Sequence, residues 1–175
     1  MKLKPGIYAF AAAGALGCAT LLAGCAGLGL GDVVQAPRFT VAEGRTAELR
    51  LVAPSSQNPM GGAGIRLWAR VENPNAFGVA LAALQGSLAL EGTPAANVDF
   101  PLGVPLIARA DTVIPLDITV RFSDLPGLAD VAARLLTRSA INYQLDGTVT
   151  VDAGALGQPK FGPSTLLRGD LVVRR

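Results

Sequence analysis

The chain has 175 residues, of which 15 are basic and 13 are acidic, and it contains no histidine. Without histidine, a serine nucleophile has no imidazole base and zinc loses one of its usual protein ligands, so acyl transfer by a Ser-His pair is excluded. The formal net charge of +2 gives no strongly basic surface, and no nucleic-acid partner is expected.

The first residues of the chain resemble a bacterial lipoprotein signal peptide. Two lysines give the segment a positive start, and the apolar run over residues 7–22 is short for a membrane span. The small residues Ala23 and Gly24 precede Cys25 and leave its thiol open to an enzyme that attaches lipid. We therefore predict that residues 1–24 are removed as a signal peptide and that Cys25 carries palmitate-like acyl chains.

This prediction also sets the charge and the expected location of the mature chain. Removing Lys2 and Lys4 leaves 13 basic and 13 acidic residues, so the mature chain is close to neutral. Cys18 leaves with the signal peptide, and no disulfide is then expected within one chain. Ala26 stands where many inner-membrane lipoproteins have aspartate, so the outer membrane of the cell envelope is favoured if one is present. The alternative to a cleaved signal peptide is a retained N-terminal helix, in which Cys25 is an ordinary small apolar residue.

The remaining sequence predicts a short tether followed by one domain. Residues 25–36 begin with a glycine-rich stretch that favours a flexible lipidated tether. Residues 37–175 are numerous enough to build one domain with its own hydrophobic core.

From Pro37 onward, apolar residues recur mostly at every second position, which is typical of strands with one buried face and one exposed face. Between Val79 and Leu90 this alternation changes phase at Ala83-Leu84, which predicts a β-bulge. Pro115 predicts an edge strand or the start of a strand. Further strands are expected near residues 39–41, 49–51, 65–71, 114–122, 141–151 and 165–173.

Two segments depart from the strand pattern. Residues 128–136 carry an apolar stripe at helical spacing, and Asp124 is a plausible cap, so one short α-helix is expected. Residues 153–163 are rich in glycine and proline and are expected to form a loop. Together these features predict a mainly β fold, an antiparallel sandwich of immunoglobulin or fibronectin type III shape with about seven strands and one helix.

The strand expected over residues 65–71 runs directly into Asn73, Pro74 and Asn75, and alternating aliphatic residues follow. This arrangement resembles the LEA type 2 family, also called the WHy domain for water stress and hypersensitive response. From the residues alone, the three positions predict a structural turn in preference to a binding site, because proline fixes one backbone angle and asparagine side chains bond nearby amides.

The resemblance extends over roughly residues 37–173 and implies a non-enzymatic domain associated with desiccation or another stress. Such a domain would protect or scaffold the envelope. Cys25 would attach this domain to the membrane of the bacterial envelope, where its partner would be an envelope protein or lipid. No catalytic residue, metal site or cofactor is expected, because carboxylates such as Asp117 stand singly and no calcium-loop spacing occurs.

A different class of function is a module that binds lipid or another hydrophobic ligand. The stretch from Phe100 to Ile107 is apolar and contains two prolines, so it could line a groove or the mouth of a loop. Ordinary packing of these residues into the core is the competing interpretation.

Overall fold

The computed structural model describes residues 33–56, 59–124 and 139–174. These residues form eight strands, joined by turns and by two short 3-10 helices, η1 (Phe122–Asp124) and η2 (Gly154–Leu156). The strands are β1 (Arg38–Val41), β2 (Ala47–Val52), β3 (Gly62–Glu72), β4 (Val79–Leu90), β5 (Thr93–Leu106), β6 (Asp111–Arg121), β7 (Ala140–Asp152) and β8 (Lys160–Arg174).

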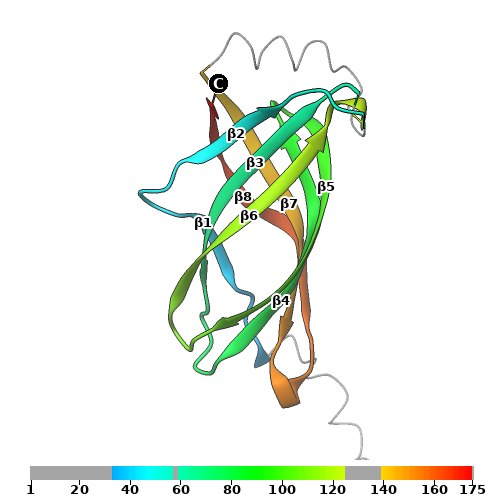
Figure 1. Ribbon diagram of the computed structural model, residues 1–175. Coiled ribbons are helices and arrows are strands. Elements are labelled where there is room, and N and C mark those ends of the chain that lie inside the picture. Colours follow the sequence, from blue (N-terminus) through cyan, green and yellow to red (C-terminus); the bar gives the residue numbers. More distant parts are fainter. Residues whose placement is uncertain (1–32, 57–58, 125–138, 175) are drawn as a thin grey trace, which may run out of the picture.

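Hydrogen bonds join all eight strands into one sheet in the order β1-β3-β2-β8-β7-β4-β5, and β6 pairs with the other side of β3. The short strands β1 and β2 share one side of the long strand β3. Neighbouring strands run antiparallel, except that β2 and β8 run parallel. The sheet curls on itself (Figure 1), and its inner face encloses the hydrophobic core.

The core follows the alternation seen in the sequence. Every second residue of β6 from Ile114 to Val120 is buried, whereas the residues between them lie mostly on the exposed face. Strands β3 and β7 repeat the pattern, with Leu67 and Leu145 fully buried. Because successive residues of a strand point to opposite faces, the period of two in the sequence reports burial directly. The strands predicted from this period are confirmed.

The predicted mainly β fold is confirmed, and the expected number of strands is close to the eight observed. The immunoglobulin-like detail is not confirmed, because the bonds between β2 and β8 continue the strands into a single sheet. The loop expected over residues 153–163 ends earlier, since β8 begins at Lys160. The helix expected over residues 128–136 lies outside the described residues.

Strand β4 contains the predicted phase change. Its register shifts between Leu81 and Ala83 relative to both β5 and β7, just before the position expected from the sequence. The irregularity lets Val79 and Leu81 face the core together with Leu84 and Leu88, although the two pairs differ in parity. The predicted β-bulge is therefore confirmed.

Strand β5 is the strand that the sequence pattern did not indicate. Its prolines, Pro94, Pro101 and Pro105, lack the amide hydrogen that a strand within a sheet donates to its neighbour. They are tolerated because β5 pairs only with β4 and each proline is exposed. The interpretation of residues 100–107 as a loop mouth is therefore wrong over most of its length. Pro115 lies in β6, which pairs only with β3 and is an edge strand, as predicted.

Two glycines allow β4 and β7 to approach closely. Gly86 and Gly147 are direct partners, and a Cβ on Gly147 would lie 2.5 Å from the carbonyl oxygen of Gln85. A Cβ on Gly86 would lie closer still to the carbonyl oxygen of Asp146. The pairing of β7 with β8 also shifts register on both sides of Gly147. Neither position accepts a side chain without separation of the strands.

Tyr143 of β7 is the largest of the fully buried side chains in the described part of the chain. Its ring covers Gly169, its partner on β8, where a Cβ would lie 3.2 Å from the ring atom Cε1. The hydroxyl is buried and has no hydrogen-bond partner among the described residues. Burial raises the pKa of Tyr143, and the negative charge of Asp170 adds to this effect.

Gly147→Ala is expected to lower the free energy of unfolding by about 3 kcal/mol, because the added methyl group collides with the backbone of β4. The matched control is Gly64→Ala in β3, where a Cβ would meet nothing within 4 Å. The control should be neutral or stabilising by up to about 1 kcal/mol, as expected for glycine replaced within a strand. Urea unfolding measures both, and equal stability of the two variants would contradict the close approach.

Tyr143→Phe is expected to raise the free energy of unfolding by up to about 1 kcal/mol, because it removes a buried hydroxyl without opening a cavity. The raised pKa also means that the wild-type domain loses stability as the pH passes the ordinary tyrosine value of 10.0, where the unfolded chain releases this proton first. The variant should lack this part of the loss. Urea unfolding at neutral pH and just above pH 10 tests both effects. A variant less stable than the wild type at neutral pH contradicts them.

Candidate functional site

The turn formed by Asn73, Pro74 and Asn75 follows β3 directly, at the end of the domain where residues 33–37 lead into β1 (Figure 1). The side chains of both asparagines are buried, with exposed fractions of 0% for Asn73 and 3% for Asn75. Buried amides are stable only when their donors and acceptors are bonded. The partners of these two side chains therefore determine what the Asn-Pro-Asn turn does.

The side chain of Asn73 holds the turn against β5. Its Nδ2 lies 2.9 Å from the carbonyl oxygen of Phe77 and 3.2 Å from the carbonyl oxygens of Leu106 and Ile107. Its Oδ1 accepts hydrogen bonds from the backbone N–H of Asn75 at 3.0 Å and from Asn75 Nδ2 at 2.9 Å. One amide thus closes the β3–β4 turn and fastens the end of β5 to it.

The side chain of Asn75 holds the incoming N-terminal segment. Its Oδ1 accepts a hydrogen bond from the backbone N–H of Gln35 at 2.8 Å, and its Nδ2 donates to the carbonyl oxygen of Gln35 at 3.0 Å. Val34, the preceding residue, is fully buried in the core. The packed structure therefore includes Val34 and Gln35, two residues of the segment interpreted as tether.

Backbone bonds complete the connection. The N–H of Asn73 donates to the carbonyl oxygen of Ala110 at 2.9 Å, and the N–H of Arg109 donates to that of Asn75 at 3.1 Å. The β5–β6 turn itself is closed by a bond of 3.2 Å from Ala110 N–H to Ile107. The Asn-Pro-Asn turn consequently joins three parts of the chain that are distant in sequence, and its geometry is that of a structural joint.

Gln35 is the partner in this joint that the sequence did not indicate. A single glutamine after two valines has no periodicity, and its bonds use only its backbone. Val34, an apolar residue close to a glycine-rich stretch, was the one feature of the sequence that could have indicated packing of this segment against the domain.

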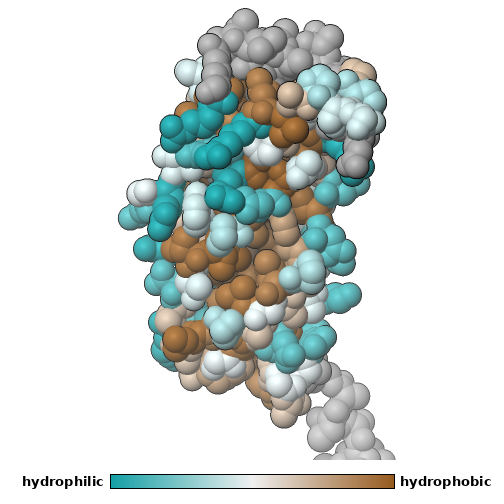
Figure 2. All heavy atoms as spheres, in the orientation of Figure 1, coloured by the Kyte–Doolittle hydropathy of each residue, from teal (hydrophilic) through white to brown (hydrophobic). Residues whose placement is uncertain are grey.

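The outer face of β2, β3 and β6 carries ion pairs. Arg66 contacts Asp117 through two bonds of 2.6 and 3.0 Å, and its donors hold the pKa of Asp117 below the usual value. Glu48 lies between Arg174 at 2.9 Å and Arg50 at 3.2 Å, and their hydrogen bonds lower its pKa in the same way. Hydrophilic atoms gather over β2 and β3 in Figure 2. These pairs are largely exposed, so each adds little to stability.

Three of the carboxylates that stood singly in the sequence have other side-chain partners in the structure. Asp117 and Asp111 each face an arginine, and Asp99 contacts Gln85. A glycosidase needs two carboxyl groups on opposite sides of one substrate bond, whereas each of these three carboxylates contacts an arginine or a glutamine. Within residues 33–56, 59–124 and 139–174, no group of three or more His, Cys, Asp or Glu could hold a metal ion.

Most of the stretch considered as a lipid-binding groove packs against the core, whereas Ile107 at its end is exposed. Leu106 is buried, and Phe100, Leu102 and Val104 pack against the core as partly buried residues. A shallow apolar hollow remains beside the strand, and its lining consists of Gly78, Val79, Ala80, Pro105, Leu106, Ile107, Ala108 and Asp152. The hollow lies next to the Asn-Pro-Asn turn, because the carbonyl oxygens of its lining residues Leu106 and Ile107 accept hydrogen bonds from Asn73.

Cys25 lies outside the described residues, and its lipidation stays a prediction. Among the residues that the structure describes, no helix has the length and hydropathy to cross a membrane.

Asn73→Asp keeps the size of the side chain but turns a carboxylate oxygen toward three carbonyl oxygens. We expect it to lower the free energy of unfolding by about 3 kcal/mol at neutral pH, because the buried charge loses its bonds and is repelled. Part of the lost stability should be regained in acid, where the protonated carboxyl group can donate a hydrogen bond again. The control Asn97→Asp lies on the exposed face of β5 and should change stability by less than about 0.5 kcal/mol. Equal urea midpoints for the two variants would contradict the assigned bonds.

The sequence matches a family model described as late embryogenesis abundant protein, LEA_2, over residues 69–165. This range includes the Asn-Pro-Asn turn and all of β4, β5, β6 and β7. No curated protein sequence gives a significant match.

Two solved structures share the fold. The solution structure of AT1g01470 from Arabidopsis thaliana is 18% identical with a TM-score of 0.57, over 81% of this chain and 85% of that chain. The solution structure of At2g46140.1, described as a candidate late embryogenesis abundant (LEA) protein, is 19% identical with a TM-score of 0.50, over 78% of this chain and 71% of that chain. The resemblance seen in the sequence is confirmed, and because the family model covers more than half of the 175 residues, this chain belongs to the late embryogenesis abundant LEA_2 family.

Proposed function

We propose that this protein is a lipid-anchored LEA type 2 domain of a bacterial cell envelope, which protects the envelope during drying or osmotic shock and catalyses no reaction. The observation that carries the proposal is the direct succession of a lipoprotein-like N-terminus and a LEA_2 domain in one chain. Its partners would be the membrane that holds the lipid of Cys25 and the envelope proteins within reach, with the outer membrane favoured.

The short connection between anchor and domain supports a role at the membrane surface. Val34 follows Cys25 by nine residues, which span at most about 30 Å when fully extended. Val34 is buried, and Gln35 forms two hydrogen bonds with Asn75. These contacts hold both residues in the domain, so they do not lengthen the tether. A domain held in this way stays within about 30 Å of its acyl chains.

The chemistry of the chain supports a non-enzymatic role. The sequence has no histidine, and acylation of Cys25 would leave no free thiol. The amides of the Asn-Pro-Asn turn are used in bonds within the fold, and Asp111 and Asp117 are paired with arginines. The exposed surface includes ion pairs and two edge strands whose prolines limit pairing with another chain.

A second candidate function is carriage of a hydrophobic ligand, and the shallow apolar hollow between β4 and the end of β5 is the observation that favours it. Native mass spectrometry of the mature protein, before and after incubation with envelope lipids, separates the two functions. A stoichiometric lipid adduct in addition to the acyl chains of Cys25 would favour carriage. A mass without such an adduct would favour protection.

The anchor is tested by Cys25→Ser combined with a conventional secretory signal, in a strain that lacks the wild-type gene. The wild-type protein should fractionate with membranes and restore survival after drying, because the acyl chains hold it at the surface it protects. The variant should appear in the soluble envelope fraction and restore survival less. Wild-type survival of the deletion strain under drying and osmotic shock would argue against a protective role. Full protection by the soluble variant would show that protection does not depend on the anchor.

A further inference from the structure

Exposed apolar side chains lie at the end of the domain where the N-terminal segment joins it. Ile107, in the β5–β6 turn, is 72% exposed, more than any other large hydrophobic residue in the described part of the chain, and Val33 is 50% exposed. Hydrophobic atoms are visible at the surface over this turn, at the lower left of Figure 2. The apolar hollow continues this patch through Pro105 and Ala108. The end of the domain nearest to Cys25 in the chain therefore presents apolar surface to its surroundings.

The fold holds Ile107 in this exposed position. Its carbonyl oxygen lies within hydrogen-bonding distance of Asn73 Nδ2 and accepts a bond from the N–H of Ala110. The next bond along the turn runs from Arg109 N–H to Asn75. Because both flanks of the turn are fixed to the Asn-Pro-Asn turn, Ile107 cannot rotate into the core. A rigid apolar tip gains free energy when another apolar phase covers it.

A cation without a counter-ion stands beside this tip. Arg109 is exposed and forms no ion pair with any residue that the structure describes, whereas Arg66 and Arg70 are paired with aspartates on the outer face of the sheet. The carboxylate that lines the hollow, Asp152, is bonded to Gly154 N–H and to Gln158. An apolar tip next to a free arginine is suited to a bilayer surface that carries anionic headgroups.

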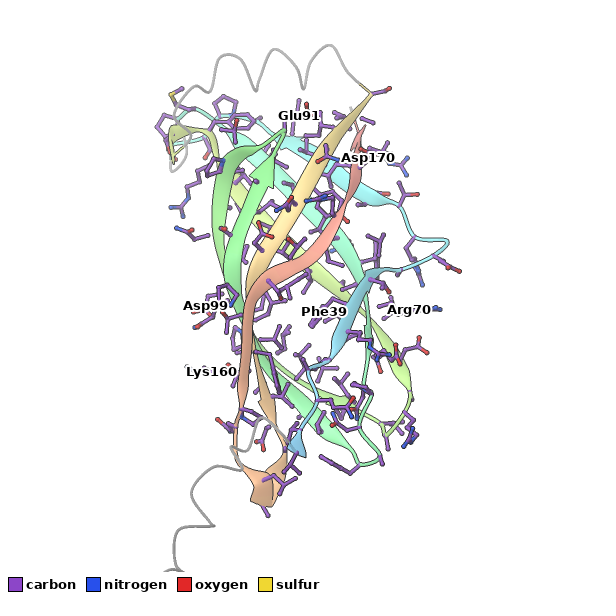
Figure 3. All side chains as sticks on the ribbon, turned by 180° about the vertical axis from the view of Figure 1, so that it is seen from behind. Phe39, Arg70, Glu91, Asp99, Lys160 and Asp170 are labelled. Atoms are coloured by element: carbon purple, nitrogen blue, oxygen red, sulfur yellow. The ribbon has the colours of Figure 1, made fainter. Side chains whose placement is uncertain are left out.

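The short connecting chain indicates that the bilayer is the partner that covers this apolar surface. The N-terminal segment reaches the domain at Gln35, which is bonded to the same turn that fixes Ile107. The opposite end of the domain, where Glu91 and Asp170 lie in Figure 3, is separated from this end by strands such as β4, whose 12 residues span about 40 Å. A tether of at most about 30 Å keeps the first end close to the anchored membrane.

We infer that the β5–β6 turn docks on the bilayer that holds the lipid of Cys25, with Ile107 inserted among the headgroups and Arg109 in contact with anionic lipid phosphates. The inference rests on the proposed lipid anchor. It assigns the domain an orientation, in which the Asn-Pro-Asn turn faces the membrane and the β4–β5 turn points away from it.

The test uses the full lipoprotein, whose mature chain would contain no free thiol once Cys25 is acylated. Ile107→Cys places a single thiol on the turn, and Asp170→Cys places one at the opposite end as the matched control. Each protein is purified from membranes in detergent, labelled with a nitrobenzoxadiazole maleimide and reconstituted into vesicles of phosphatidylethanolamine and phosphatidylglycerol. We expect the label at position 107 to shift its emission to the blue and to be quenched by doxyl-labelled phospholipid, and the label at position 170 to do neither.

Each result decides between the anchor and the docking. If the protein floats with the vesicles but the label at position 107 behaves like the label at position 170, docking is overturned and the anchor stands. Wild-type protein that does not float with the vesicles overturns the anchor and docking together. A blue shift that doxyl lipid does not quench indicates contact with a second protein copy and also overturns docking.

The role of the cation is tested separately. Arg109→Glu, added to the labelled Ile107→Cys protein, should weaken quenching in vesicles that contain phosphatidylglycerol and have little effect in vesicles of phosphatidylcholine alone. Equal loss in both kinds of vesicle would overturn the contact between Arg109 and anionic lipid. Unchanged thermal unfolding of each variant verifies that the fold persists. A label on Val33→Cys supplies a second probe of the same surface.

Discussion

The fold depends on a small network of buried amides at one end of the sheet. Asn73 and Asn75 lie out of water, and their side chains bond the backbone of Phe77, the end of β5 and Gln35. A neutral amide suits this place because one short side chain offers two donors and an acceptor, which neither a carboxylate nor a hydroxyl provides. The network fixes the backbone of Gln35, and with it the point at which the N-terminal segment joins the domain.

Two further features shape the curled sheet: the close approach of β4 and β7, and the prolines in its edge strands. Gly86 and Gly147 let the backbones of β4 and β7 approach, while Tyr143 covers the strand beside them at Gly169. The edge strands β5 and β6 carry prolines, which limit their pairing with another chain. On the proposed function this protection is useful, because drying concentrates proteins and favours contact between unpaired strand edges.

Charge is distributed unevenly between the outer face of the sheet and the end that holds the Asn-Pro-Asn turn. Arg38, Arg66, Arg70 and Arg174 each meet a carboxylate on a neighbouring strand. At the other location, Arg109 stands without an ion-pair partner among the described residues, beside the exposed Ile107. The paired charges keep the outer face hydrated, and Arg109 is available to a partner.

The sequence by itself determined most of the buried strand residues, because the burial of a strand with one exposed face has a period of two. The strand from Ile65 to Val71 and the bulge in β4 could be predicted from this period, and the turn at Asn73 from the turn chemistry of proline and asparagine. Only the tertiary structure decided that β5 is a strand, that β2 pairs with β8 in parallel and that Gln35 bonds to Asn75. These features depend on which backbone groups meet across a long separation in sequence, and that meeting leaves no local pattern.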